Sequence, residues 1–267
     1  MNKKTTKKKS APRDEECFSV TDLHVSVGDT PIIRGVTFAL RPGQIHILMG
    51  PNGSGKSTLL NAIFGNPHCT ITSGTLTIGK KDFTTAPVHE RARAGLFLGF
   101  QEPAEIPGVT IGSFLRTAKN TINEGVPGTE HLTPMAFAGI LKRSLQTLDL
   151  DERFGGRSLN DGFSGGEKKK NELLQMVVLQ PRFALLDEFD SGLDVDALKV
   201  AVSVIMKTAA KEKTGFLLVS HNPRILKGLT PSGVHVMAGG RIVRTGGSDV
   251  LKEIDKHGYE RLVGGIL

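Results

Sequence analysis

The chain has 267 residues, of which 38% are hydrophobic and 23% are charged, and its formal net charge is +7. These values are ordinary for a folded globular protein and argue against wholesale disorder. The two cysteines, Cys17 and Cys69, are too few for a disulfide framework or for a zinc or iron–sulfur site made by this chain alone. No stretch of about eighteen apolar residues indicates a membrane span. We therefore expect a cytoplasmic protein without direct membrane insertion.

Part of the positive charge lies in residues 1–16, which contain six Lys or Arg and three Asp or Glu. We expect this segment to be a disordered, solvated basic tail, followed by one ordered domain over residues 17–267. The remaining charge is mild and only 5% of the residues are aromatic, so the sequence offers no platform for stacking bases. Nucleic acid is not an expected partner.

The first ordered elements are expected to be strands. Residues 18–27 and 32–40 have β-like apolar patterns, and a turn separates them. Residues 44–49 form a nearly apolar run, which is typical of a strand buried on both faces. A glycine-rich loop, a helix over residues 56–64 and a strand over residues 75–78 should follow.

Strand signals fade between residues 101 and 162, where helical patterns predict helices over 114–121, 134–148 and 150–154. A short helix is expected after residue 220. The other later elements should be helices over residues 166–179, 195–211 and 248–257, strands over residues 183–186 and 215–220, and a hairpin over residues 233–245. Alternating strands and helices predict an α/β fold with a mostly parallel core sheet.

The strongest local motif matches G-x-x-x-x-G-K-[ST], a phosphate-binding loop between a buried strand and a helix. Backbone N–H groups of such a loop converge on phosphate at the positive end of the helix. Lys56 would supply a cation to the β- and γ-phosphates, and Ser57 would place its hydroxyl on Mg²⁺. The nine residues predicted to bind the nucleotide are Gly50, Pro51, Asn52, Gly53, Ser54, Gly55, Lys56, Ser57 and Thr58.

A pair of acidic residues follows the apolar run 183–186. Asp187 is the predicted Mg²⁺ ligand, because Mg²⁺ prefers a few carboxylate and hydroxyl ligands together with water and phosphate. Glu188 lies one residue further on, where it can face an attacking water, and we predict it to be the polarising base. An acid after a strand is a weak signal alone and becomes specific when it is combined with the phosphate-binding loop.

A third motif, Phe163-Ser164-Gly165-Gly166, matches the signature [LF]-S-G-G. Alone, it would indicate no more than a serine-capped helix start. Together with the two other motifs, it makes the chain resemble the ABC-type ATPases. The resemblance implies that Ser164 and Gly166 contact the γ-phosphate of ATP bound to a second copy. Two copies would thus form an ATP-dependent homodimer.

The resemblance also assigns roles to smaller motifs. Gln101 follows a predicted strand, as the family's Q-loop glutamine does, and would sense Mg²⁺ and the attacking water. His221 matches the switch histidine that contacts the γ-phosphate, and residues 191–194 match the D-loop at the dimer interface. The implied catalytic residues are Glu188, His221, Gln101 and Lys56, and the implied metal ligands are Ser57, Gln101 and Asp187.

The implied fold is an ABC-type P-loop NTPase with a mostly parallel core sheet, an N-terminal antiparallel β subdomain and an inserted helical subdomain. The nucleotide-binding core would comprise residues 17–100 and 163–267. Residues 101–162 would form the helical subdomain.

Three segments narrow the resemblance to the SufC family, the soluble ABC ATPases of Suf iron–sulfur cluster assembly. They are residues 100–109, 163–172 and 187–199. Transporter ATPases more often read LSGGQ-x-QR at the signature. The SufC resemblance implies ATP and Mg²⁺ as cofactors and SufB- and SufD-type scaffold proteins as partners. The alternative is a nucleotide-binding subunit of a membrane ABC transporter, which uses the same hydrolytic residues.

Overall fold

The computed structural model describes residues 16–124, 126–220 and 228–259. Residues 1–15 of the predicted tail, the short helix expected after residue 220 and His221 lie outside these ranges. No helix within the described residues is both long enough and apolar enough to cross a membrane.

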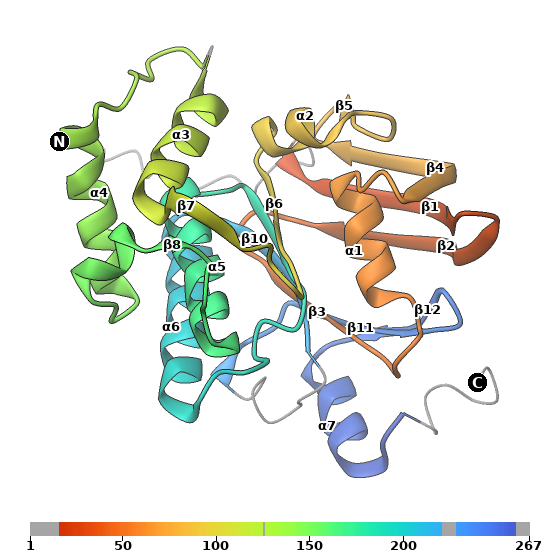
Figure 1. Cartoon of the computed structure of the whole chain (residues 1–267). Coiled ribbons are helices and arrows are strands. Elements are labelled where there is room, and N and C mark those ends of the chain that lie inside the picture. Colours follow the sequence, from red (N-terminus) through yellow and green to blue (C-terminus); the bar gives the residue numbers. More distant parts are fainter. Residues whose placement is uncertain (1–15, 125, 221–227, 260–267) are drawn as a thin grey trace, which may run out of the picture.

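The core of the fold is a six-stranded sheet with the order β12-β11-β3-β10-β9-β6 (Figure 1). All neighbouring strands are parallel except β11 and β12, which form an antiparallel hairpin. The predicted mostly parallel sheet is confirmed. Its strands are β3 (Ile45–Met49), β6 (Leu96–Gly99), β9 (Phe183–Leu186), β10 (Gly215–Val219), β11 (Gly233–Ala238) and β12 (Arg241–Gly246).

A second, antiparallel sheet has the order β2-β1-β4-β5 and contains β1 (Phe18–Val27), β2 (Thr30–Leu40), β4 (Cys69–Ile78) and β5 (Lys81–Asp82). The expected start of β4 at residue 75 is wrong by six residues. A Cβ atom on Gly74, where φ is +90°, would lie 2.2 Å from the carbonyl oxygen of Asp22. Glycine at this position therefore lets β4 continue beside the irregular middle of β1. The threonine-rich first half of β4 lacks the clear apolar alternation that predicts a strand.

The core sheet packs on both of its faces, because successive residues of its strands point in opposite directions. One face packs on α1 (Lys56–Phe64) and the antiparallel sheet, and it includes Leu48 and Leu185. The other face includes Ile47 and Leu186 and packs on α5 (Gly165–Leu179), α6 (Val195–Lys211) and α7 (Ser248–His257). Helices α3 (Ile111–Asn123) and α4 (Pro134–Thr147) join the same hydrophobic cluster by packing on α5 (Figure 1). Helices α1 and α5 thus lie on opposite faces of the sheet.

The inserted segment between β6 and β9 is not purely helical, which corrects the expectation for residues 101–162. Strands β7 (Ile106–Thr110) and β8 (Ser158–Leu159) pair as a small antiparallel sheet, and a 3₁₀ helix spans Glu152–Gly156. Every residue of β7 is exposed and the strand contains Pro107 and Gly108, so it lacks the alternation that predicts a strand. Helix α3 begins at Ile111, three residues earlier than predicted, because Thr110 caps it through the Ser113 amide.

Two buried histidines connect β3 and β11. The Nδ1 atom of His46 lies 3.0 Å from Nε2 of His235, whose own Nδ1 lies 3.0 Å from the hydroxyl of Thr245. Burial lowers the pKa of each imidazole to about 4. The folded protein therefore keeps both rings neutral at a pH where an unfolded chain protonates them.

The stability of the protein is expected to fall when the pH is lowered from 7 to 5. Between pH 6.5 and about 4 the unfolded chain binds more protons at His46 and His235 than the folded chain does. Acid therefore favours unfolding in this interval, and the loss is about 2 kcal/mol per ring. Urea unfolding at the two pH values measures it. The double variant His46→Leu, His235→Leu should show a smaller loss, whereas the exposed-site control His68→Gln should not. An undiminished pH dependence in the double variant would contradict the prediction.

Candidate active site

The loop at residues 50–55 joins the buried strand β3 to helix α1, as the motif predicts. Two glycines are required by its close packing. A Cβ atom on Gly50, where φ is +149°, would lie 2.1 Å from the carbonyl oxygen of Met237. Gly55, at φ +100°, precedes the first turn of α1 and packs against the side chains of Ile33 and Met237. The loop is thereby held against β11, and its backbone amides lead into the helix N-terminus.

The side chain of Lys56 is folded over this loop and is only 6% exposed. Its ammonium donates to the carbonyl oxygens of Gly50 and Pro51, at 3.0 and 2.9 Å. Burial lowers the pKa of Lys56, while the carboxylates of Asp187 and Glu188 act in the opposite direction. A cation thus lies inside the loop, at the position where the motif requires one for phosphate.

Ser57 and Asp187 are brought together from α1 and from the end of β9. The Ser57 hydroxyl lies close enough to the Asp187 carboxylate to lower its pKa. Oxygen Oδ1 of Asp187 is buried and has no hydrogen-bond partner. Burial raises the pKa of Asp187, the Ser57 hydroxyl lowers it, and Glu188 raises it further. A half-buried hydroxyl beside a buried carboxylate with an unused oxygen fits a hard cation such as Mg²⁺, which takes oxygen ligands.

Gln101 and Glu188 meet at the same edge of the core sheet, because they follow the adjacent parallel strands β6 and β9. The side-chain amide of Gln101 donates to Oε2 of Glu188 across 3.2 Å. Glu188 has φ +46°, a left-handed conformation that is uncommon for a residue other than glycine. Such conformations persist where the surroundings enforce them and cluster at functional sites. The predicted base and the predicted sensor are thus direct neighbours.

Ser164 and Gly166, the residues of the signature motif, contact their own helix and the segment 191–194. Ser164 caps α5 in a capping box with Glu167. A Cβ atom on Gly166 would lie 2.8 Å from the carbonyl oxygen of Gly192 in the segment 191–194, so the two loops pack closely. Ser164 and Gly166 lie at the start of α5, whereas the phosphate-binding loop leads into α1, which packs on the other face of the core sheet. The predicted His221 lies outside the described residues.

A buried arginine that the sequence analysis did not single out supports the phosphate-binding helix from its far end. Arg91, in α2 (Val88–Arg93), is 3% exposed. Its guanidinium donates to the carbonyl oxygens of Ala62 and Ile63 in the last turn of α1, and to those of Thr84 and Ala86. A cation at a helix C-terminus complements the helix dipole. A local sequence pattern could not reveal this role, since Arg91 and Ala62 are 29 positions apart.

Replacing Arg91 by Met is expected to destabilise the protein by about 3 kcal/mol, because several buried carbonyl groups lose their donor. Arg93→Met is the matched control in the same helix. Arg93 makes a partly exposed ion pair with Glu124, whose loss should cost under about 1 kcal/mol. Urea unfolding of the two variants compares them. Equal stabilities would show that the cap of α1 contributes little.

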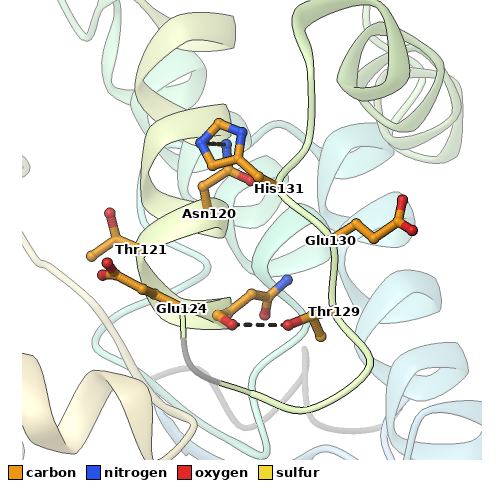
Figure 2. A pocket seen from close by; sticks show the side chains of 7 residues that line it. Asn120, Thr121, Glu124, Thr129, Glu130 and His131 are labelled. Carbon is orange, nitrogen blue, oxygen red and sulfur yellow. Dashed lines mark hydrogen bonds between the residues drawn. The ribbon is translucent and has the colours of Figure 1, made fainter.

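A separate polar pocket of about 300 Å³ lies between the end of α3 and residues 129–131 (Figure 2). Asn120 contacts His131 at 3.1 Å and accepts the backbone N–H of Leu132, while the Thr129 hydroxyl donates to the Asn123 carbonyl. These bonds attach the connection that follows α3 to the helix. None of the predicted site residues lines this pocket.

Comparison with known proteins identifies the family. Residues 33–191, more than half of the chain, match the family described as "ABC transporter". "Vegetative protein 296" of Bacillus subtilis (strain 168) is 44% identical over 243 residues, which cover 91% of this chain and 92% of the relative. "Probable ATP-dependent transporter ycf16" of Antithamnion sp. is 42% identical over 245 residues, with coverages of 92% and 97%.

Comparison with solved structures agrees with this fold. The solved "Dimeric structure of a post-hydrolysis state of the ATP-binding cassette MJ0796 bound to ADP and Pi" superposes with a TM-score of 0.74 at 18% identity, covering 86% of this chain and 98% of that one. The match to the family and the two full-length relatives together show that this chain belongs to the ABC transporter family and is an ATP-binding ABC ATPase.

Proposed function

We propose that the chain is the ATP-hydrolysing subunit of a Suf iron–sulfur cluster assembly machinery, in which ATP-driven dimerisation remodels a SufB/SufD-type scaffold. The observation that carries this narrower assignment is the SufC-like sequence of residues 100–109, 163–172 and 187–199. These segments contribute Gln101, Ser164 and Glu188. The resemblance is therefore concentrated where nucleotide chemistry would be coupled to a partner.

In the proposed reaction, the backbone amides of residues 52–57 and the Lys56 ammonium bind the phosphates of ATP, the substrate. Ser57 and Asp187 would hold Mg²⁺, with Gln101 beside them, and the bound ion would neutralise negative charge on the phosphates. The Glu188 carboxylate accepts a hydrogen bond from the attacking water and orients it. We assign His221 the contact to the γ-phosphate that its family position implies.

A second copy is proposed to complete the site. Ser164 and Gly166 begin α5 and the phosphate-binding loop leads into α1, two helices on opposite faces of the core sheet. We assign them to a nucleotide bound to another subunit, as the family resemblance implies.

The scaffold is proposed to bind beside Gln101. Phe100, Ile106 and Val109 are 46%, 39% and 39% exposed. Phe100 also lines an apolar groove of about 190 Å³, together with Phe64, Leu179 and others. In our proposal a SufB- or SufD-type subunit covers this surface in the cytoplasm, and residues 101–162 act as a helical subdomain between a core of residues 17–100 and 163–267.

The second candidate function is that of a transporter subunit. It is favoured by the names of relatives, such as "Probable ATP-dependent transporter ycf16" and "Probable ABC transporter ATP-binding protein SpyM3_0208", the latter 43% identical over 242 residues. The same hydrolytic residues would serve it, with a membrane permease in place of the scaffold.

Affinity capture distinguishes the two functions. Tagged Glu188→Gln protein is incubated with ATP in an extract of its native cells, and soluble and membrane fractions are analysed separately by mass spectrometry. Recovery of soluble SufB- or SufD-like proteins supports the assembly role. Recovery of a polytopic membrane protein instead would overturn it in favour of transport. Lys56→Met protein is the control for capture that does not depend on nucleotide.

A further inference from the structure

Helix α5 carries a buried ion pair that the roles assigned above do not use. The ammonium of Lys169 lies 2.9 Å from Oε2 of Glu172, three positions along the helix. The two side chains are 6% and 8% exposed. Burying two charges is costly and is offset only where further hydrogen bonds satisfy the remaining donors and acceptors.

The Lys169 ammonium makes two further bonds, both to backbone carbonyls at the candidate active site. It donates to the carbonyl oxygen of Phe100 at 2.9 Å and to that of Asp187 at 3.0 Å. With Glu172 as the third acceptor, all three of its N–H donors are used. The two carbonyls belong to the residues directly before Gln101 and Glu188.

These carbonyls lie where the ladder between β6 and β9 ends. The last paired residues of the ladder are Gly99 and Leu186. One more bond follows this pair, from the Asp187 amide to the carbonyl oxygen of Gly99 at 3.3 Å. Buried carbonyls past the end of a ladder need another donor. Lys169 supplies one donor to each strand and so fixes the two chain segments relative to one another.

We propose that Lys169 is a positioning residue for ATP hydrolysis: its ammonium holds the peptide carbonyls that precede Gln101 and Glu188, and Glu172 balances its charge. The bond of 3.2 Å between Gln101 and Glu188 requires both backbones to be in register. The left-handed conformation of Glu188 requires surroundings that enforce it. The transporter pattern LSGGQ-x-QR has a neutral glutamine at this place, which lacks a third donor and a charge.

The inference rests on the roles proposed for Gln101 and Glu188 and not on the Suf assignment. Its first test compares purified Lys169→Met with Lys119→Met. Lys119 is a matched control, since its ammonium also has three acceptors, the carbonyls of Val178 and Leu179 and the side chain of Gln180, but none at the catalytic loops. Lys169→Met should lower kcat by about 10- to 100-fold and change the Kd for ATP by less than about threefold, while Lys119→Met retains kcat.

A second test separates positioning from general damage to the fold. If Lys169 acts through Gln101, the losses in kcat from Lys169→Met and Gln101→Ala should not multiply in the double variant. Fully multiplicative losses, or a wild-type kcat in folded Lys169→Met, would overturn the proposal. Should Lys169→Met fail to fold, the double variant Lys169→Met, Glu172→Met removes both buried charges together with the donors to the two carbonyls, and the same outcomes in kcat apply.

The role of Glu188 as the base and the positioning role of Lys169 can be refuted separately. Wild-type hydrolysis by Glu188→Gln would refute the proposed base, and the positioning role with it. An inactive Glu188→Gln together with an unchanged kcat of Lys169→Met would refute only the positioning role.

Discussion

Glu188→Gln is expected to lower kcat for ATP hydrolysis by about 10²- to 10⁴-fold, because an amide cannot act as the base toward the attacking water. The substitution preserves the shape of the side chain, and an amide oxygen can still accept the hydrogen bond from Gln101. ATP binding should therefore be retained. With ATP bound and hydrolysis blocked, the variant should accumulate as a dimer, as the proposed role of Ser164 and Gly166 requires.

Steady-state phosphate release measures the loss of hydrolysis, and size-exclusion chromatography with light scattering, with and without ATP, measures the dimer. Glu102→Gln is the matched control, since Glu102 is an exposed carboxylate directly after Gln101. Its kcat should stay near that of the wild type. Wild-type hydrolysis by Glu188→Gln would mean that Glu188 is not the base.

The second large effect is expected for Lys56→Met. The ammonium lies inside the loop, 3.0 and 2.9 Å from two of the loop's carbonyl oxygens, where it can turn to phosphate. Charge-assisted hydrogen bonds to phosphate contribute about 1.5–3 kcal/mol, so the Kd for ATP should rise about 10- to 100-fold. The aliphatic part of the side chain is preserved, which limits the loss of packing in this buried position.

Isothermal titration with a non-hydrolysable ATP analogue measures the affinity. Lys211→Met, which removes an exposed lysine from the last turn of α6, should leave the Kd unchanged. Tight binding by Lys56→Met would remove the phosphate-binding role from this residue.

Most elements could be read from local patterns. The strand over Ile45–Met49 is apolar except for His46, and the helix over Lys56–Phe64 follows a motif whose geometry demands one. Strand β7 could not be found in this way, because it is exposed along its whole length and pairs with β8 nearly fifty positions later. Its pairing depends on where the ends of the inserted segment meet in space.

Among the catalytic candidates too, residue identities could be predicted from local motifs, whereas contacts between distant residues depend on the fold. Lys56, Ser57, Asp187 and Glu188 were predicted from motifs, since phosphate and Mg²⁺ chemistry requires these residue types at short, constant spacings. The contact between Gln101 and Glu188 joins residues 87 positions apart and depends on β6 and β9 being neighbours. Lys169 was visible only as one of three consecutive lysines, and burial distinguishes it from the other two.

The sequence by itself determined the family, the phosphate-binding loop, the order of most strands and helices and the residue types of the hydrolytic site. Each of these depends on side-chain chemistry or on periodicity within a few residues. Only the tertiary structure decided to which carbonyl oxygens Arg91 and Lys169 donate hydrogen bonds and which face of the sheet carries α1 or α5. It also decided that Glu188 adopts a left-handed backbone conformation. These features arise because a buried charge must find its partners among backbone groups that the fold, and not the local sequence, brings within hydrogen-bonding distance.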